Sequence, residues 1–230
     1  MEVPVPPTGL REAKKARTRQ AISDIATRLF MERGFEAVTV AEIAAAADVS
    51  VKTVFNYFPT KEDLFFDRAA ELIGGLEATI RDRAPGVTVA AALHRLLADN
   101  LVPFPGTGWR RLRDPEHYEL FRTYVATERA SPALRARRHV IADTWAAPLA
   151  AAVAAALELP EGDPRAEAFA AMVLAAMALR HRTLAGAVLE RRGARSVERR
   201  VRAVVDEALG RIARAFADVD RPPDRPSGGV

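Results

Sequence analysis

The chain has 230 residues, of which 49% are apolar and 28% are charged, and its formal net charge is +4. This composition is that of a globular protein long enough for one large domain, or for a small module and a larger domain. The absence of cysteine excludes disulfides and thiolate zinc sites. A positive net charge suits a polyanionic partner such as nucleic acid, although arginine-rich compositions also arise without one.

The sequence has no segment that resembles a signal peptide or a membrane span. Residues 1–9 contain three prolines and no long apolar run. Residues 145–157 form the most apolar stretch, which is shorter than the roughly 18 residues needed and is interrupted by Pro148. We therefore expect a cytoplasmic protein without a membrane partner.

Proline and glycine divide the chain into about nine predicted helices, and no segment has a convincing strand pattern. The predicted fold class is therefore all-α. Residues 1–10 and 220–230 are expected to be disordered tails. Between them we expect a small N-terminal domain over residues 11–60 and a larger helical domain over residues 61–219.

The first predicted helix carries an apolar stripe and ends at Gly34, a typical C-terminal cap. A short second helix begins after Thr39, which forms a capping-box pair with Glu42. Ser50 can cap a third helix that runs to Phe58, before Pro59. Thr60 can cap a long fourth helix, whose apolar stripe consists of Leu64, Phe65, Ala69, Leu72, Ile73, Leu76 and Ile80.

Residues 39–58, TVAEIAAAADVSVKTVFNYF, have the organisation of a helix-turn-helix motif. Small residues such as Ala44 and Ala47 allow the two short helices to approach closely. Asp48 occupies the sharp turn, where aspartate tolerates a left-handed conformation better than most residues do. Such a motif places its second helix in the major groove of DNA.

On a helical wheel of that second helix, Val54 and Phe58 face the core and Lys52 and Asn56 face outward. Lysine can bind phosphate or guanine, and the asparagine amide can bind adenine through both of its ends. The boundary positions are Val51, Thr53, Phe55 and Tyr57, of which Thr53 and Tyr57 can reach phosphate oxygens.

Basic residues flank the motif on both sides. Lys61, in the first turn of the next helix, is placed for another phosphate. Upstream lies a basic arm that could follow the DNA backbone or could be a solvated tail. It consists of Arg11, Lys14, Lys15, Arg17 and Arg19, opposed by Glu12.

The stretch from Arg17 to Phe65, RTRQAISDIATRLFMERGFEAVTVAEIAAAADVSVKTVFNYFPTKEDLF, resembles the DNA-binding domain of the TetR family of bacterial regulators. The resemblance implies a homodimer whose two recognition helices enter successive major grooves of a palindromic operator. It also implies a C-terminal domain whose small-molecule effector releases the protein from double-stranded DNA. Position 55 is phenylalanine where many relatives carry a tyrosine that holds phosphate, and Asp48 replaces a frequent glycine.

These observations predict a transcriptional regulator. Repression is the favoured mode of regulation, and activation is the alternative. The predicted DNA-binding residues are Arg17, Thr39, Ser50, Val51, Lys52, Thr53, Phe55, Asn56, Tyr57 and Lys61.

Aromatic and methionine side chains in the larger domain could line an apolar effector pocket with a few polar groups. The candidates are Phe104, Trp109, Tyr118, Phe121, Tyr124, Trp145, Met172, Met177 and His181. Aromatic and methionine residues at helical spacing are usually core residues, and this is the favoured interpretation for any one of them, so the hypothesis concerns the set.

The last two predicted helices, about residues 163–192 and 197–219, are the expected dimer interface. The first has an alanine face that permits close packing, and the second has a long aliphatic stripe. The alternative is that both belong to the core of one chain.

No metal, cofactor or catalytic activity is expected. The four histidines lack metal-ligand spacing, and the chain has no glycine-rich phosphate loop, nucleophile elbow or HExxH motif. Two rival hypotheses are an enzyme built on the larger domain and a structural adaptor. The adaptor would leave the outward Lys52 and Asn56 without a role.

Overall fold

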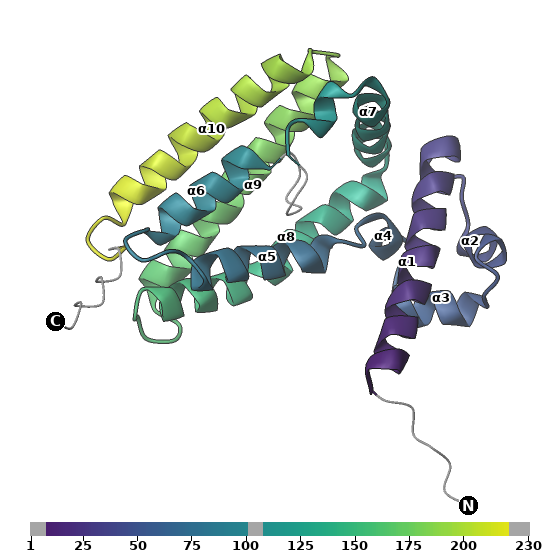
Figure 1. Ribbon diagram of the computed structural model, residues 1–230, viewed down its shortest axis with the longest axis horizontal. Helices are drawn as coiled ribbons and strands as arrows, with labels where there is room; N and C mark the ends of the chain where they lie inside the picture. The colour runs from purple at the N-terminus through teal and green to yellow at the C-terminus, as the bar shows by residue number, and fades with distance from the viewer. Residues whose placement is uncertain (1–7, 101–107, 221–230) are drawn as a thin grey trace, which may run out of the picture. The chain divides into compact units, whose positions relative to one another are not determined.

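The computed structural model describes residues 8–100 and 108–220. Over these ranges it contains ten α-helices, one short 3-10 helix and a single β-bridge between Asn100 and Gly108, so the predicted all-α class is confirmed (Figure 1). The chain packs as two compact units. The first contains residues up to Asp67 together with Ala126–Arg137, and the second contains Arg68–Val125 and the residues from Arg138 onward.

The helices of the first unit lie mostly in the N-terminal third of the chain. They are α1 (Thr8–Arg33), α2 (Val40–Ala46), α3 (Val51–Tyr57) and α4 (Lys61–Phe65). The second unit is built from longer helices, and α7 and α8 each have one end in the first unit. These elements are α5 (Ala69–Arg81), α6 (Val89–Asp99), η1 (Arg111–Arg113), α7 (Pro115–Ala130), α8 (Pro132–Ala156), α9 (Pro164–Leu189) and α10 (Ala194–Ala215).

The predicted long fourth helix is wrong, because the chain leaves the helical path between Phe65 and Ala69. A capping box between Thr60 and Asp63 starts α4, which ends after five residues. Beyond it, Asp67 is bonded to α1: its carbonyl accepts a hydrogen bond from Arg19 at 2.7 Å, and its carboxylate accepts one from the hydroxyl of Ser23. These ties hold the chain against α1 and separate α4 from α5.

Both predicted tails are shorter than expected where the structure describes them. Helix α1 begins at Thr8, directly after Pro7, so residues 8–10 are helical. Asp220 is 4% exposed, and its two carboxylate oxygens accept hydrogen bonds from the backbone N–H groups of Val89 and Ala90. It therefore caps the N-terminus of α6. The rest of the predicted tails lies outside the described residues.

The core of the first unit is rich in phenylalanine. Phe30 lies 5.0 Å from Phe35 and 6.1 Å from Phe65, measured between ring centroids, and all three side chains are buried. Phe58, at the end of the helix-turn-helix, is also buried, and the guanidinium of Arg19 lies 4.8 Å from its ring centroid. This core fixes α2 and α3 on α1.

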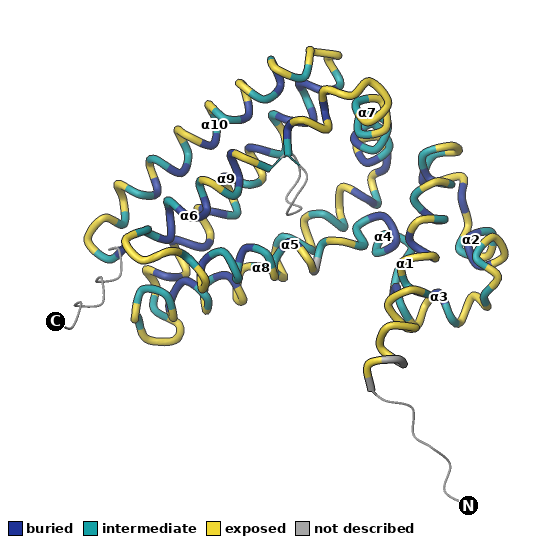
Figure 2. Tube along the Cα trace, in the orientation of Figure 1, coloured by how far each residue is buried: buried dark blue, intermediate teal, exposed yellow. Residues whose placement is uncertain are grey.

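The second unit has an aliphatic and alanine-rich core. Helix α10 packs against α9 and α6 (Figures 1 and 2). Its Val201, Val205 and Leu209 are buried, with at most 2% exposure. Most exposed positions of α10 carry charged side chains, whereas many exposed positions of α8 and α9 do not. The outer surfaces of these helices therefore differ in chemistry.

Candidate nucleic-acid interface

A complete capping box starts α2. The hydroxyl of Thr39 accepts a hydrogen bond from the backbone N–H of Glu42 at 3.2 Å, and the Glu42 carboxylate accepts one from the backbone N–H of Thr39 at 2.7 Å. Arg33, at the end of α1, lies 2.7 Å from the same carboxylate. The backbone hydrogen bond from Thr39, followed by its hydroxyl and Arg33, lowers the pKa of Glu42 to about 2. Glu42 thus joins α1 to α2 as an anion.

The turn between α2 and α3 has the strained geometry that the sequence predicts. Asp48 has a φ of 53°, in the left-handed region. The next residue, Val49, donates its backbone N–H to the carbonyl of Ala44 at 3.0 Å, which closes the turn. Ser50 then caps α3 by accepting a hydrogen bond from the N–H of Thr53 at 3.0 Å. The local sequence therefore sets the angle at which α3 leaves α2.

The side chains of α3 divide into a buried and an exposed set, as the helical wheel predicts. Val54 and Phe58, at its C-terminal cap, are buried, with 0% and 1% exposure. Lys52 and Asn56 are exposed and one turn apart, and within the described residues neither polar group takes part in a hydrogen bond or an ion pair. Two donors therefore project from one face of a helix that is anchored on its other face.

The remaining residues predicted on this helix have mixed environments. Thr53 and Tyr57 are half-buried, and the hydroxyls of Ser50 and Thr53 lie 2.8 Å apart in a mutual hydrogen bond. Val51 and Phe55 are exposed, at 39% and 45%. The caps Thr39 and Ser50 are exposed as well, but their hydroxyls already hold helix N-termini.

Lys61 has a structural partner that the sequence did not predict. Its ammonium donates a hydrogen bond to the carbonyl of Phe35 at 2.6 Å and lies 4.2 Å from the centroid of the Phe35 ring. Burial lowers the pKa of Lys61, against the opposing influence of Glu36 and other carboxylates. Lys61 therefore ties the start of α4 to the loop after α1, and its role toward DNA stays a prediction.

The predicted basic arm is helical where the structure describes it, because it forms the start of α1. Lys14, Lys15 and Arg17 are exposed and free to approach an anion. Arg19 is half-buried and points inward, toward Phe58 and Asp67. The basic residues of this segment thus lie in two different environments.

Two ties of the first unit involve the distant segment Ala126–Arg137. The hydroxyl of Ser131 donates to the carboxylate of Glu36 at 2.5 Å, and the guanidinium of Arg137 donates to the carboxylate of Asp63 at 2.9 Å through Nε. These partners are 95 and 74 positions apart along the chain. No local sequence signal marks such pairs, so they are absent from the predicted contacts.

The predicted effector-binding residues all belong to the second unit, except that Phe104 lies outside the described residues. Trp109 is buried and donates its indole N–H to the carbonyl of Ala98 at 2.7 Å. Tyr118 is half-buried and donates its hydroxyl to the carbonyl of Arg192 at 2.7 Å. Phe121, Trp145 and Met177 are half-buried against the same core, and Phe121 stacks on Tyr124. The structure thus brings most of the set to one core.

Two members of that set differ from the rest. Met172 is 39% exposed on the outer side of α9, so it is not an interior residue of this chain. His181 is half-buried.

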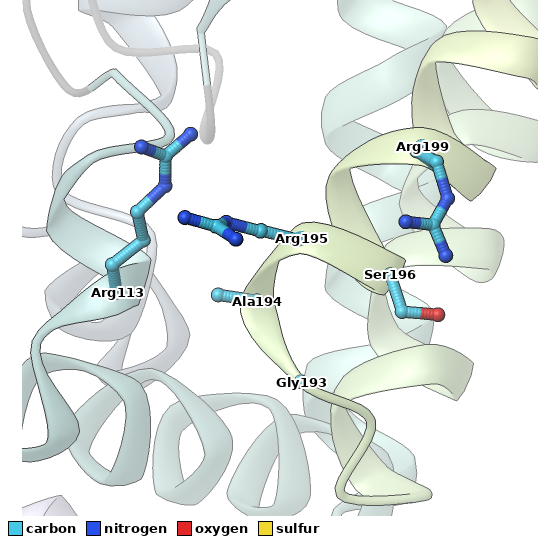
Figure 3. Close-up of a pocket in the computed structure, with 6 residues that line it drawn as sticks. All are labelled: Arg113, Gly193, Ala194, Arg195, Ser196 and Arg199. Carbon is cyan, nitrogen blue, oxygen red and sulfur yellow. The ribbon is translucent and has the colours of Figure 1, made fainter.

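A hollow of about 500 Å³ lies elsewhere in the second unit and has a different character (Figure 3). It is lined by Arg113, Gly193, Ala194, Arg195, Ser196 and Arg199, and Figure 3 shows the guanidinium of Arg195 extending toward the side chain of Arg113. Arg113 also pairs with Glu198 at 3.2 Å. None of the predicted effector-binding residues lines this hollow.

Comparison with known proteins identifies the helix-turn-helix region. Residues 22–68 match the family model of bacterial regulatory proteins, tetR family. The HTH-type transcriptional regulator LuxR of Vibrio harveyi is 49% identical over 59 residues, which are 23% of this chain and 29% of the relative. AcrR of Shigella flexneri is 38% identical over 72 residues, which are 30% of this chain and 34% of the relative. The matches thus span about a third of these relatives' length.

Among solved structures, FadR of Thermus thermophilus, a TetR-family repressor in complex with lauroyl-CoA, is 25% identical to this chain. The match covers 92% of this chain and 100% of that one, with a TM-score of 0.44.

Proposed function

We propose that the chain is a regulator of the TetR family, whose model matches residues 22–68, and that it binds a palindromic DNA operator as a homodimer and represses transcription. The observation that carries the proposal is the exposed pair Lys52 and Asn56 on α3, opposite the buried Val54 and Phe58. The protein is not proposed to be an enzyme, and its expected location is the cytoplasm.

The chemistry of this pair suits base recognition in the major groove. The ammonium of Lys52 can donate to guanine O6 and N7, or to a phosphate oxygen. The amide of Asn56 can donate to N7 of adenine and accept from its N6 amino group, which fixes one base. Lys14, Lys15 and Arg17, at the start of α1, add positive charge that acts on phosphates without selecting a sequence.

The test is a selection of DNA fragments from the source genome by the full-length protein, followed by affinity measurements at several salt concentrations. Wild type is expected to enrich a palindrome, and Lys52→Ala/Asn56→Ala is expected to lose the preference while keeping weak, salt-sensitive binding. Arg214→Ala, which removes an exposed charge from α10, serves as the control and should behave like wild type. A wild-type protein that enriches no sequence at any salt would exclude the proposal.

The outer face of α9 supports the dimer. Its exposed side chains follow a helical spacing of three and four and carry no charge over about 17 Å of helix. They are Ala168, Ala171, Met172, Ala175, Ala178 and Leu179, of which Leu179 is 40% exposed. Alanines at this spacing let a second helix approach closely, so we propose that α9 packs against α9 of a second copy.

Helix α8 contributes a second apolar face, and α10 does not. Val140 is 47% exposed, and only 17% of the most apolar 18-residue window of α8 is buried. By contrast, the outer positions of α10 include Arg199, Glu207 and Arg211. We therefore revise the expected interface from residues 163–192 and 197–219 to α9 together with α8.

Helices α8 and α9 are also long and apolar enough to cross a membrane. We favour a second copy over lipid because Arg180 is buried in α9 and bonded to the carbonyl of Leu97, as in the core of a water-soluble bundle. In addition, Arg182 interrupts the exposed face of α9.

The dimer is tested by light scattering coupled to size exclusion. Ala175→Glu places a carboxylate in the middle of the proposed interface, where burial of an unpaired charge is unfavourable, so the variant should run as a monomer. Ala203→Glu on the exposed face of α10 is the matched control and should remain dimeric. A dimeric Ala175→Glu variant, or a wild type that sediments with lipid vesicles, would contradict the interface.

Effector control is proposed to act by linkage between two states of the dimer. The half-buried Tyr118, Phe121, Trp145 and Met177 are the proposed ligand contacts. Since α7 and α8 each have one end in the first unit, a change in the core of the second unit can reach Ser131 and Arg137 along these helices. This route follows α7 and α8 and does not cross the break between α4 and α5.

The linkage has a reciprocal test. A compound that raises the Tm of the full chain and weakens operator binding should itself bind more weakly, by the same factor, when operator DNA is present. Arg137→Ala should leave the affinity for the compound unchanged and reduce this factor. A factor that stays unchanged in the variant would exclude the route through Arg137.

A further inference from the structure

Two large apolar side chains are exposed on α3, beside the polar pair that we propose to contact DNA. Val51 and Phe55 are one helical turn apart, and they are 39% and 45% exposed. Among the large apolar residues that the structure describes as exposed, Phe55 is the only aromatic one. It is therefore the feature of this surface that most needs an explanation.

The first unit does not use Phe55 for its own packing. Its aromatic core consists of Phe30, Phe35, Phe58 and Phe65, all of which are at most 4% exposed. Over the described residues, Phe55 makes no ring contact with any of them, although Phe30, Phe35 and Phe65 contact one another. Folding of this unit thus leaves the ring of Phe55 in solvent.

A phosphate contact does not account for Phe55 either, because its ring has no hydrogen-bond donor. Its neighbours on the exposed face are Lys52 and Asn56, which can both contact base edges. In the major groove, the one large apolar group that distinguishes a base is the C5-methyl group of thymine. Cytosine at the same position offers no methyl group.

We propose that Phe55, with Val51 beside it, selects thymine in each half-site of the operator by packing on the 5-methyl group. The proposal rests on the proposed function, since it requires α3 to lie in the major groove. It adds an apolar element of specificity to the hydrogen bonds of Lys52 and Asn56. Contact with the methyl group also removes the exposed ring and Val51 from water.

The experiment compares thymine with deoxyuridine, which lacks only the methyl group and keeps the same hydrogen-bonding edge. The preferred site of the wild-type protein is first selected from a random DNA library. Each symmetric pair of thymines is then replaced by deoxyuridine, and the Kd is measured by fluorescence anisotropy. Replacement of the pair of thymines that Phe55 contacts should lower the affinity about fourfold for each half-site. This factor corresponds to the free energy of burying one methyl group.

The variant Phe55→Ala should bind the thymine and deoxyuridine sites with equal affinity at that pair, while it still prefers the selected site to unrelated DNA. Leu120→Ala, which shortens an exposed apolar side chain of α7, is the control and should keep the thymine preference. The comparison of the two DNAs needs only wild type, so it stays decisive even if the variant is unstable.

The outcomes separate this inference from the proposed function. Specific binding that ignores every methyl group, or a selected site without thymine, overturns the role of Phe55 and leaves the regulator intact. A methyl preference that survives in Phe55→Ala overturns it as well. Selection of no sequence at all overturns both proposals.

Discussion

The helix-turn-helix of the first unit and the larger second unit are each stabilised by polar contacts, but these contacts differ in their range along the chain. In the first unit, α2, α3 and α4 each begin at a cap whose partner is three residues away, as for Thr39 and Glu42. In the second unit, Asp220 caps α6 from 131 positions away, and the guanidinium of Arg83 reaches the carbonyl of Ala156 over 73 positions. A surface that must present α3 in one orientation is thus specified locally, whereas the larger unit depends on long-range ties.

Loss of the most distant tie should give the largest effect on stability. Asp220→Ala removes the acceptor of two buried N–H groups, those of Val89 and Ala90, at 2.7 and 2.9 Å. The expected loss is about 3 kcal/mol in the free energy of unfolding of the second unit. Both tryptophans of the chain lie in that unit, so their fluorescence during urea unfolding reports on it.

The matched control is Glu207→Ala, which breaks an exposed ion pair with Arg211 on α10. Its effect should stay below about 0.5 kcal/mol, because exposed pairs contribute little. If Asp220→Ala had an equally small effect, the long-range tie would not matter to the second unit.

A smaller effect is expected from substitution of Lys61. It distinguishes a role of Lys61 in stabilising the loop after α1 from a role in contacting DNA. Lys61→Met loses the hydrogen bond to the carbonyl of Phe35, so amide exchange in the loop after α1 should become about fivefold faster. The salt dependence of DNA binding should match wild type, whereas Lys52→Ala should lower the slope by about one phosphate contact. A lower slope for Lys61→Met with unchanged exchange would support the phosphate role that the sequence predicts.

The smallest effect is a pH dependence of the capping box. The pKa of Glu42 is about 2 in the folded chain, below its ordinary value of 4.5. A lowered pKa stabilises the folded state fully above pH 4.5, and this stabilisation disappears as the pH falls toward 2. Unfolding of the first unit should therefore be easier for Glu42→Gln than for wild type at pH 7, and the difference should shrink between pH 4.5 and 2. A difference that stays constant over this range would contradict the anionic role of Glu42.

The sequence predicts the first unit well because its signals are local. The cap residues Thr39 and Ser50, the φ of Asp48 and the buried side of α3 all depend on neighbours within a few positions. The one break that it missed, between α4 and α5, depends on contacts of Asp67 with α1 over more than 40 positions. For the same reason it assigned Asp220 to a tail and gave Lys61 and Arg19 no intramolecular partner.

For the candidate site and the proposed dimer face, the sequence predicts which side chains are exposed. The exposure of Lys52 and Asn56 follows from the helical period, and so does the exposure of the α9 alanines. Which residues a helix exposes, however, depends on which of its sides packs into the core. Only the packed structure reveals that the aliphatic stripe of α10 is buried in the core of its own chain.

The central claim is that α3 reads bases through Asn56, and one measurement tests it most directly. The selected operator is changed at one symmetric A·T pair at a time to G·C, and the Kd is measured for wild type and for Asn56→Ala. Wild type should lose about tenfold in affinity at one pair, and Asn56→Ala should be insensitive to the change at that pair. Equal sensitivity of both proteins at every pair would contradict the claim that Asn56 reads the operator.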